Sequence, residues 1–384
     1  QNCTTLGQTP NTAFPVCGTL IFRQNIVPLC VNNQQLNVPG CNPGYPDRNP
    51  FYYKFTCYVS GTLGFRITPL AANEDYDWHL WDITGVNPNT VLSGSPPPTV
   101  IANWAGTYGA TGASSSGTSN IQCGSDPSEN RPTFAQMPNL IAGHEYLLLV
   151  SHFTDGQSGY DLSFSGGTAV ITDPKIPAPL APQVSCDGTS ITLKLNKKVR
   201  CPTLTSSGSE FSLSPAITTI TAASPDSCGF AFDFDELTLT LAAPLLDGTY
   251  DLIINNGTDG NTLRDNCDNA IPVGTRISFT YAAPQPIRAD SIRKTNCRTD
   301  SILLYYPKKI RCSSITAAGT DFAVSGPTPV TVVSAGGNCV NDQTEYVVIR
   351  FADPIYTKGT YTLTIQPGID GSPVFDACGQ PILP

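Results

Sequence analysis

The chain has 384 residues, enough for two or three domains at roughly 150 residues each. Its formal net charge of −9 argues against nucleic acid and anionic membrane surfaces as partners. Only 13% of the residues are charged, whereas Gly (33) and Pro (34) are abundant, a composition typical of β-sandwiches with many turns. No run of about 18 apolar residues occurs, so we expect no membrane span.

The 14 cysteines are spread over the whole chain and include no C-x-x-C pair, which favours disulfides over zinc or iron–sulfur ligation. Disulfides persist in oxidising compartments, so the sequence predicts a secreted or bacterial cell-surface protein. The chain opens with Gln1-Asn2-Cys3, without Met or an apolar segment. We therefore expect a mature N-terminus left by signal-peptide cleavage.

Residues 1–172 are expected to form one disulfide-rich β-sandwich of the jelly-roll type. Short apolar or alternating segments predict strands at 51–59, 64–69, 77–82, 145–150 and 159–164. The Gly- and Ser-rich stretch 106–120 predicts a long exposed loop. The Pro-rich stretch 171–182 predicts a short stiff linker to the rest of the chain.

The remainder of the chain is an internal repeat. A shift of 111 residues places Cys186 on Cys297, Cys201 on Cys312, Cys228 on Cys339 and Cys267 on Cys378. Lys197–Cys201 falls on Lys308–Cys312 in the same shift. Each copy has about seven strand-like segments with turn signals every 8–12 residues, which is typical of immunoglobulin-like sandwiches. We predict two tandem Ig-like domains, at 173–283 and 284–384.

The two copies are not equal. The segment Arg276–Tyr281, predicted to close the first copy, has no counterpart in the second, because Pro384 corresponds to Val273. The second copy is therefore expected to lack its final strand and to leave an open edge. Two explanations remain: the natural chain continues, or a strand from another subunit fills the groove, as in a filament assembled by strand complementation.

The cysteines fall into sets of six, four and four, so bridges within each domain are expected. Six cysteines allow fifteen connectivities and four allow three, so the sequence leaves the pairing open. We favour Cys3–Cys17, Cys30–Cys41, Cys57–Cys123, Cys186–Cys228 and Cys201–Cys267, with Cys297–Cys339 and Cys312–Cys378 as the equivalent pairs of the second copy.

The order of segments 51–55, 61–69, 74–82, 103–112, 143–150 and 158–169 resembles the N-terminal region of a known family. These are large cell-surface proteins of Bacteroidota, associated with gliding motility and exported by type IX secretion. In that family such domains precede Ig-like or PKD repeats, so the resemblance implies a surface location more than a mechanism. The triplets Asp290-Ser291-Ile292 and Asp300-Ser301-Ile302 resemble the O-glycosylation sequon of Bacteroidota, which makes Ser291 and Ser301 candidate glycosylation sites.

No pattern of catalytic residues emerges. The three histidines are His79, His144 and His152, and none accompanies a recognisable nucleophile motif. His79 alternates with Trp78 and Leu80, and we expect it at a surface or interface. No phosphate-binding glycine loop precedes a helix. The sequence therefore predicts that the protein is not an enzyme.

Two groups of residues are candidates for ligand binding. The acidic run Glu74, Asp75, Asp77 and Asp82 is the best candidate for Ca²⁺, with Asp75 and Asp77 as the expected ligands, although strand-end aspartates also cap turns. Trp104 and Tyr108 are candidates for contact with a glycan, whereas Trp78 and Trp81 lie on opposite faces of a strand and core packing explains them better.

We predict a non-catalytic extracellular protein of the cell surface, either an adhesin or a gliding-associated protein. Its partners would be other surface or extracellular proteins, glycans, or copies of itself. Two alternatives remain: a subunit of an extracellular filament, and a secreted carbohydrate-binding module. No cofactor is expected apart from Ca²⁺.

Overall fold

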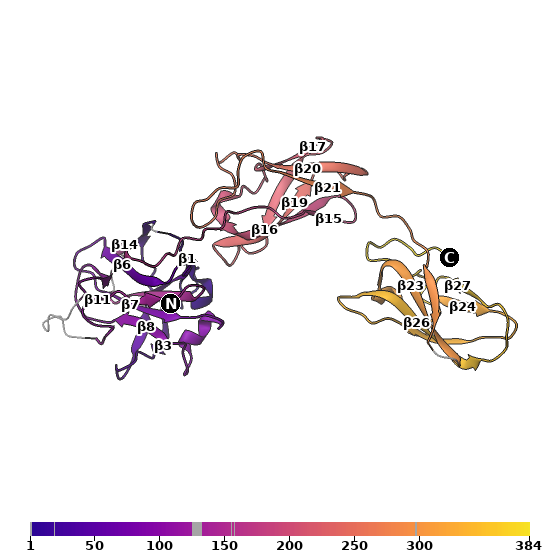
Figure 1. Ribbon diagram of the computed structural model, residues 1–384, viewed down its shortest axis with the longest axis horizontal. Helices are drawn as coiled ribbons and strands as arrows, with labels where there is room; N and C mark the ends of the chain where they lie inside the picture. The colour runs from indigo at the N-terminus through magenta and orange to yellow at the C-terminus, as the bar shows by residue number, and fades with distance from the viewer. Residues whose placement is uncertain (1, 19, 125–132, 155, 157, 296–297) are drawn as a thin grey trace. The chain divides into compact units, whose positions relative to one another are not determined.

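The computed structural model describes residues 2–18, 20–124, 133–154, 156, 158–295 and 298–384 (Figure 1). These residues are all-β apart from short 3₁₀ turns at Pro10–Thr12, Pro88–Leu92, Cys201–Thr203 and Cys312–Ser314, as the composition predicted. The chain divides into two compact units. One comprises Gln1–Gln183, Ser190–Ala243 and Thr249–Phe279, and the other comprises Val184–Thr189, Pro244–Gly248 and Thr280–Pro384. No helix in the described residues is long and apolar enough to cross a membrane.

The N-terminal part of the first unit is a sandwich of two sheets. One has the order β1 (Phe14–Pro15), β5 (Pro50–Thr56), β13 (Glu145–His152), β7 (Tyr76–Asp82), β8 (Thr99–Asn103) and β10 (Ile121–Gln122). The other has the order β11 (Phe134–Gln136), β9 (Thr111–Ser114), β6 (Gly61–Pro69), β14 (Ser158–Gly167) and β2 (Phe22–Ile26), with β12 (Asn139–Leu140) paired to β6. A hairpin of β3 (Val31–Leu36) and β4 (Tyr45–Arg48) is separate from both sheets.

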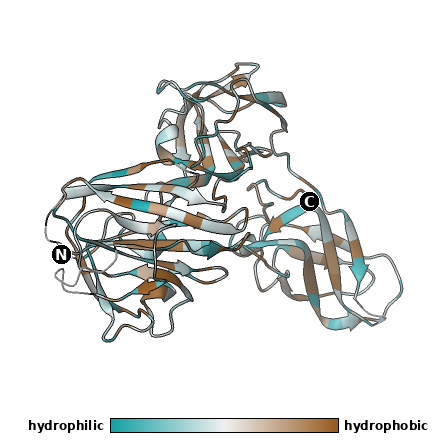
Figure 2. Ribbon diagram, turned by 60° about the vertical axis from the view of Figure 1, so that its left-hand side comes forward, coloured by the Kyte–Doolittle hydropathy of each residue, from teal (hydrophilic) through white to brown (hydrophobic). Residues whose placement is uncertain are grey.

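The central strands of the first sheet are buried on both faces. Trp78 packs between the two sheets, and Trp81, on the opposite side of β7, packs into a second core with Tyr52 and Leu149. This explains why β13 is a continuous apolar run, since a strand covered on both faces cannot alternate with polar residues. In Figure 2, apolar and polar positions do alternate along many of the other strands.

Two expectations for the N-terminal part are wrong. His79 is not at a surface: its side chain is fully buried, stacked on Trp81 with 3.8 Å between ring centroids. The stretch 106–120 is not one long exposed loop, because β9 lies inside it and pairs with β6 and β11. Its small residues are there for packing: a Cβ at Gly112 would lie 2.1 Å from the Phe65 carbonyl oxygen.

The two copies of the repeat have matching Ig-like sheets. The first copy has β15 (Gln183–Val184), β16 (Ser190–Arg200), β19 (Asp233–Leu241) and β18 (Ile220–Pro225), opposite β17 (Phe211–Ser214), β20 (Gly248–Ile254) and β21 (Arg276–Tyr281). The second has β22 (Ser291–Lys294), β23 (Thr299–Arg311), β26 (Gln343–Ile355) and β25 (Val332–Gly336), opposite β24 (Phe322–Ser325) and β27 (Thr362–Ile365). A register shift occurs at equivalent places, between Lys194 and Val199 and between Tyr305 and Ile310.

The predicted difference between the copies is present in the described residues. The smaller sheet of the first copy has three strands, in the order β17-β20-β21. That of the second copy has two, β24 and β27, so β27 has no strand on its other edge in the part of the chain that the structure describes.

The predicted disulfide pairings are wrong. The bridges are Cys3–Cys30, Cys17–Cys267, Cys41–Cys123, Cys186–Cys378, Cys201–Cys228 and Cys312–Cys339. None of the favoured pairs forms, namely Cys3–Cys17, Cys30–Cys41, Cys57–Cys123, Cys186–Cys228, Cys201–Cys267, Cys297–Cys339 and Cys312–Cys378. Cys57 is buried without a disulfide partner, and Cys297 lies outside the described residues.

The error has a local cause. We expected Cys201 and Cys267 to meet at one end of the sandwich. Instead Cys201 opens a 3₁₀ turn beside Cys228, with 5.7 Å between their Cα atoms. Cys267 lies on a turn that Asp265 stabilises, since Asp265 Oδ1 accepts the Cys267 N–H at 2.9 Å. This turn directs Cys267 to Cys17, which precedes the repeat altogether.

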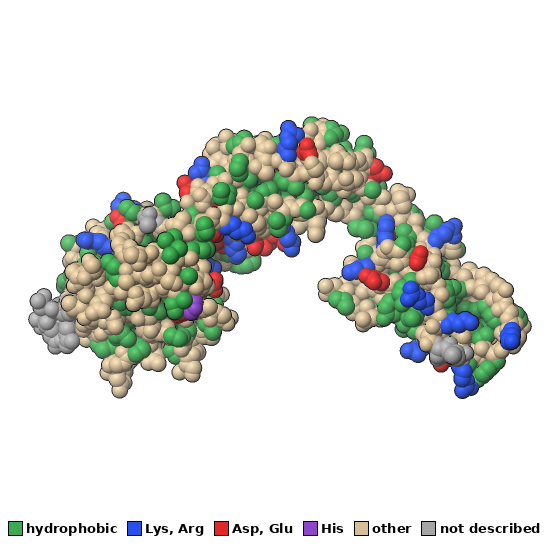
Figure 3. All heavy atoms as spheres, in the orientation of Figure 1, with side chains coloured by type: hydrophobic (Ala, Val, Ile, Leu, Met, Phe, Trp, Pro, Cys, Tyr) green, Lys and Arg blue, Asp and Glu red, His purple; other side chains and the backbone are tan. Residues whose placement is uncertain are grey.

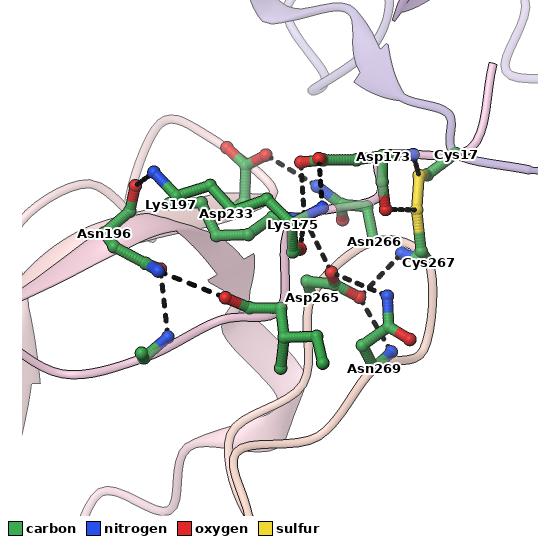
Figure 4. A network of polar contacts seen from close by, with 12 residues as sticks. Cys17, Asp173, Lys175, Asn196, Lys197, Asp233, Asp265, Asn266, Cys267 and Asn269 are labelled. Carbon is green, nitrogen blue, oxygen red and sulfur yellow. Dashed lines mark hydrogen bonds and ion pairs between the residues drawn. A yellow bond between two sulfur atoms is a disulfide. The ribbon is translucent and has the colours of Figure 1, made fainter. Parts of the chain in front are cut away.

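The contact between Cys17 and Cys267 belongs to a partly buried polar junction, shown in Figure 4. Lys197 Nζ lies 2.5 Å from Asp173 Oδ2 and 2.7 Å from Asp265 Oδ2. It also donates to the carbonyl oxygen of Lys175 at 2.8 Å. The Pro-rich stretch expected to be a linker is therefore tied to β16 by hydrogen bonds and an ion pair.

Candidate functional site

A pocket of about 420 Å³ opens beside the first sheet of the N-terminal sandwich, and we refer to it as the aromatic pocket. Its walls come from β4, from the start of β7, and from the segments that follow β8 and β13. The lining residues are Tyr45, Pro46, Arg48, Asp75, Asp77, Trp104, Gly106, Tyr108, Gly124, Phe153 and Thr154.

Strand register brings these segments together. Trp78 of β7 is paired with Asn103 of β8, so Asp77 and Trp104 follow as the next positions on the two strands. On the other side of β7, Asp77 is paired with Ser151 of β13. Two positions beyond that pairing, the Phe153 N–H donates to the Asp75 carbonyl oxygen at 3.0 Å. The start of β7 is therefore flanked by residues on or just after two other strands.

Asp75 and Asp77 are buried in this pocket without compensation. Their side chains are 3% and 5% exposed, and Oδ1 of each has no hydrogen-bond partner. Burial raises the pKa of Asp75 to about 7. Burial, and then the charge of Asp75, raise the pKa of Asp77 well above its usual value. Native structures rarely leave buried polar atoms unpaired, so these two oxygens require an explanation.

Aromatic residues form another part of the lining. Tyr45 and Trp104 are stacked, with 4.8 Å between ring centroids and 13° between ring planes. Trp104 is 3% exposed, and its indole Nε1 has no hydrogen-bond partner. Tyr108 is 57% exposed and presents an aromatic ring at the mouth of the pocket. The Arg48 guanidinium lies over the ring of Phe153, 5.2 Å from its centroid.

A buried histidine cluster adjoins the pocket through Thr154. His152 Nε2 lies 2.6 Å from Glu74 Oε2 and 2.8 Å from the Thr154 hydroxyl. The pKa of Glu74 is lowered: burial opposes the shift, but hydrogen bonds from Thr154 and His152 outweigh it. Both contacts involve the same ring nitrogen, whereas a Ser-His-Asp relay uses the two nitrogens for different partners. These two contacts therefore do not form such a relay.

The sequence had placed Asp75 and Asp77 in a cation site and Trp104 and Tyr108 in a glycan site, and the structure places all four in one pocket. Asp82 is elsewhere, with Oδ2 2.6 Å from His144 Nδ1. In the described part of the chain, no three His, Cys, Asp or Glu side chains are grouped as a metal site. The Ca²⁺ prediction thus depends on two carboxylates and neutral oxygens.

Sequence reasoning missed Tyr45, Arg48 and Phe153. Tyr45 lies between Gly44 and Pro46 in a turn-rich stretch, and an aromatic residue in such a stretch is a signal for an exposed contact. Nothing in the sequence brings this stretch next to Trp104, because they are some 60 residues apart and belong to different sheets.

The two glycosylation candidates differ in accessibility. Ser291 begins β22 and is exposed. Ser301 is 4% exposed, and its hydroxyl lies 2.7 Å from that of Thr295. In the folded chain only Ser291 is open to a modifying enzyme.

No family model matches the chain, and no curated protein matches it. Among solved structures, the chain is similar to the N-terminal part of the bacterial S-layer protein SbsC, with 16% identity, a TM-score of 0.25, and coverage of 46% of this chain and 44% of that one. Domains 1–6 of surface layer protein SbsC give 13% identity, a TM-score of 0.23, and coverage of 54% and 33%. A beta-1,2-glucanase from Parabacteroides distasonis gives 10% identity, a TM-score of 0.18, and coverage of 71% and 38%. The chain spans less than half the length of each, and similarities this weak transfer neither a fold nor an activity.

Proposed function

We propose that this protein is a non-catalytic adhesin of the bacterial cell surface or extracellular space, and that its N-terminal sandwich binds a glycan in the aromatic pocket. Six disulfides support export, because such bridges persist only in oxidising compartments. A gliding-associated role stays a prediction from the family resemblance. The same pocket would also suit a secreted carbohydrate-binding module. Such a module would differ from an adhesin in not being attached to the cell, but would recognise the glycan in the same way.

The observation that carries the proposal is the combination of an exposed ring with unpaired polar atoms. Sugar rings stack their apolar faces on aromatic side chains and bond through their hydroxyls. Tyr108 offers such a ring at the pocket mouth. Trp104 Nε1 is an unused donor, and Asp75 and Asp77 carry unused acceptors. A sugar hydroxyl both donates and accepts, so one ligand would satisfy both kinds of group.

The lining favours a ligand without a large net charge, because it includes the carboxyl groups of Asp75 and Asp77 and the guanidinium of Arg48. The N-terminal sandwich shows few charged side chains on the face seen in Figure 3, and neutral polar and apolar atoms dominate it. An anionic ligand would approach two buried carboxyl groups, which disfavours it. A neutral polysaccharide avoids this repulsion.

The test is a glycan array followed by titration calorimetry with the best glycan. Tyr108→Ala should weaken binding at least tenfold, because stacking on an aromatic ring provides much of the affinity of such sites. Phe230→Ala is the matched control, since Phe230 is a 66% exposed aromatic residue of the first repeat that does not line the pocket. Equal affinity for the wild type and Tyr108→Ala, or no binding across plant and microbial polysaccharides, would count against the proposal.

A second candidate function rests on the free edge of β27. In the first copy β21 pairs with β20 and stacks Phe279 on Tyr250, with ring centroids 5.7 Å apart. Tyr361 corresponds to Tyr250 but has no such partner strand in the described residues. Leu363 of β27 lines pockets of about 440 and 540 Å³. These features support the acceptance of a β21-type strand, as in a filament subunit.

A labelled peptide with the sequence of residues 274–283 tests this second candidate. It should bind the chain with a rise in fluorescence anisotropy and protect the β27 amides from hydrogen exchange. The same peptide with Lys in place of Phe279 should bind at least tenfold more weakly. Electron microscopy that shows only monomers, together with no peptide binding, would refute the filament hypothesis.

A further inference from the structure

We propose that Asp75 and Asp77 hold a divalent hard cation, Ca²⁺, at the base of the aromatic pocket, and that this cation takes part in ligand recognition. The second half of the proposal rests on the proposed function; the cation site itself does not. The two carboxyl groups are separated by one residue at the start of β7, and both line the pocket.

Two adjacent buried carboxylates are unstable without compensation. An isolated charge in a protein interior is strongly unfavourable, and a second like charge beside it adds to this cost. Compensation comes from protonation, from a basic side chain, from hydrogen bonds, or from a cation that holds both groups in the charged form. Oδ1 of each carboxyl group has no hydrogen-bond partner, and neither group takes part in an ion pair in the described part of the chain.

The other buried carboxylates of the sandwich and first repeat show the contrast. Glu74, next in the chain, is bonded to His152 and Thr154. Asp265 accepts the N–H groups of Cys267 and Asn269 and pairs with Lys197. These carboxylates need no ion, because protein groups satisfy them. Among the described carboxylates of these two parts, only Asp75 and Asp77 combine a buried Oδ1 that lacks a hydrogen-bond partner with a place in a pocket wall, and a cation entering that pocket would satisfy them.

The donor atoms select the kind of metal. The lining residues supply carboxylate, hydroxyl and backbone carbonyl oxygens beside the guanidinium of Arg48, and among the described residues they include neither His nor Cys. Oxygen donors favour Ca²⁺ or Mg²⁺ over Zn²⁺ or Cu²⁺. Ca²⁺ takes six to eight oxygens, so two carboxylates would leave several positions for water or for hydroxyls of a sugar. A pocket of about 420 Å³ has room for both.

Terbium is the probe, because Tb³⁺ occupies Ca²⁺ sites and luminesces when a nearby Trp or Tyr is excited. The wild-type chain should show sensitised emission from Trp104 and Tyr108, which Ca²⁺ displaces. Asp75→Asn combined with Asp77→Asn should lose at least tenfold in Tb³⁺ affinity. Asp161→Asn, a change at a surface ion pair with Arg23 in the same sandwich, should bind Tb³⁺ as the wild type does.

Thermal melts provide a second measurement of cation binding that does not depend on the strength of the Tb³⁺ emission. Ca²⁺ should raise the melting temperature of the wild type and of Asp161→Asn but not that of the double variant. The double variant is expected to fold, since it replaces two carboxyl groups, each with an unpaired Oδ1, by neutral amides of the same shape. Unchanged Tb³⁺ affinity in the double variant, or emission that Ca²⁺ does not displace, overturns the cation site.

Glycan binding separates this inference from the proposed function. If the array identifies a glycan, its affinity should fall at least tenfold in the presence of a chelator. Unchanged affinity overturns the role of the cation in recognition while the glycan site stands. If no glycan binds but Ca²⁺ protects the wild type and not the double variant, the proposed function fails while the cation site stands.

Discussion

The disulfides limit how far the oxidised chain can be extended, whether or not its strands have unfolded. Cys17–Cys267 and Cys186–Cys378 close loops of 250 and 192 residues, and the two loops overlap in sequence. A pull on the two ends must therefore pass through the bridges even after every strand has unfolded. A surface protein under load would lengthen little, and reduction would abolish that limit.

The disulfide connectivity determines the largest distance that Cys17 and Cys378 can reach. Along the backbone, Cys17 and Cys378 are about 361 residues apart, which gives roughly 1,200–1,300 Å at 3.3–3.6 Å per extended residue. With the bridges intact, the shortest covalent path crosses from Cys17 to Cys267 and follows the backbone for 39 residues to Cys228. It then crosses to Cys201, follows the backbone for 15 residues to Cys186, and crosses to Cys378. Only about 54 backbone residues therefore lie on this path. Its extended length is roughly 190–210 Å once the bridges themselves are included.

Single-molecule force spectroscopy with handles at both termini measures this difference. The oxidised chain should stop extending after a few hundred ångströms, and addition of a reductant should lengthen it by roughly 1,000 Å. Cys186→Ser combined with Cys378→Ser is the informative control. Its shortest path runs through Cys312–Cys339 and includes about 84 residues, so the distance from Cys17 to residue 378 should be roughly 300 Å. An oxidised wild-type chain that extends to its full backbone length would refute the connectivity.

Two further predictions concern stability. Lys197→Met leaves Asp173 and Asp265 without their shared cation, so the free energy of unfolding should fall by about 3–5 kcal/mol at pH 7. The pKa of Asp173 is lowered, because hydrogen bonds from Lys197 and a backbone N–H outweigh the opposing effect of burial. The stability that the ionised Asp173 contributes is therefore present above about pH 4 and is lost as the pH falls through the pKa of Asp173 in the folded chain. Urea titrations should thus show the gap between variant and wild type narrowing below about pH 4, and a gap independent of pH would contradict this. Trp81→Ala should cost about 3–5 kcal/mol because the ring is fully buried, whereas Tyr108→Ala should change stability by less than about 0.5 kcal/mol; equal losses in thermal or urea melts would mean that Tyr108 is a structural residue.

The sequence was sufficient for the parts of the fold that depend on local pattern. The 111-residue shift predicted two equivalent copies, the second without its final strand. The structure has equivalent 3₁₀ turns at Cys201–Thr203 and Cys312–Ser314, and in the described residues β27 has no strand on its other edge. It was misleading where burial depends on what covers a sheet. His79 has the alternation of a half-exposed strand, but a second core covers that face of β7, and the alternation then carries no information about exposure.

The candidate site shows the same division. Residue type alone identified Asp75, Asp77, Trp104 and Tyr108 as potential ligand contacts. Their meeting in one pocket depends on the register between β7 and β8, in which Trp78 lies opposite Asn103. A shift of that register by one residue would turn every side chain of the strand to the other face, and no local pattern fixes it where both faces are apolar.

The cysteines show why even sets do not imply pairing within a domain. Cys201–Cys228 and Cys312–Cys339 are local and equivalent, each with a sequence separation of 27. Cys267 and Cys378 are equally equivalent, since Asp265 and Asp376 stabilise the same turn before each, but they bond to cysteines far earlier in the chain. Each copy thus contributes one local bridge and one bridge to a preceding segment. The even number of cysteines in each copy therefore does not mean that they pair within the copy. Because two bridges join segments far apart in the chain, they limit the extension of several segments together and not of each copy separately.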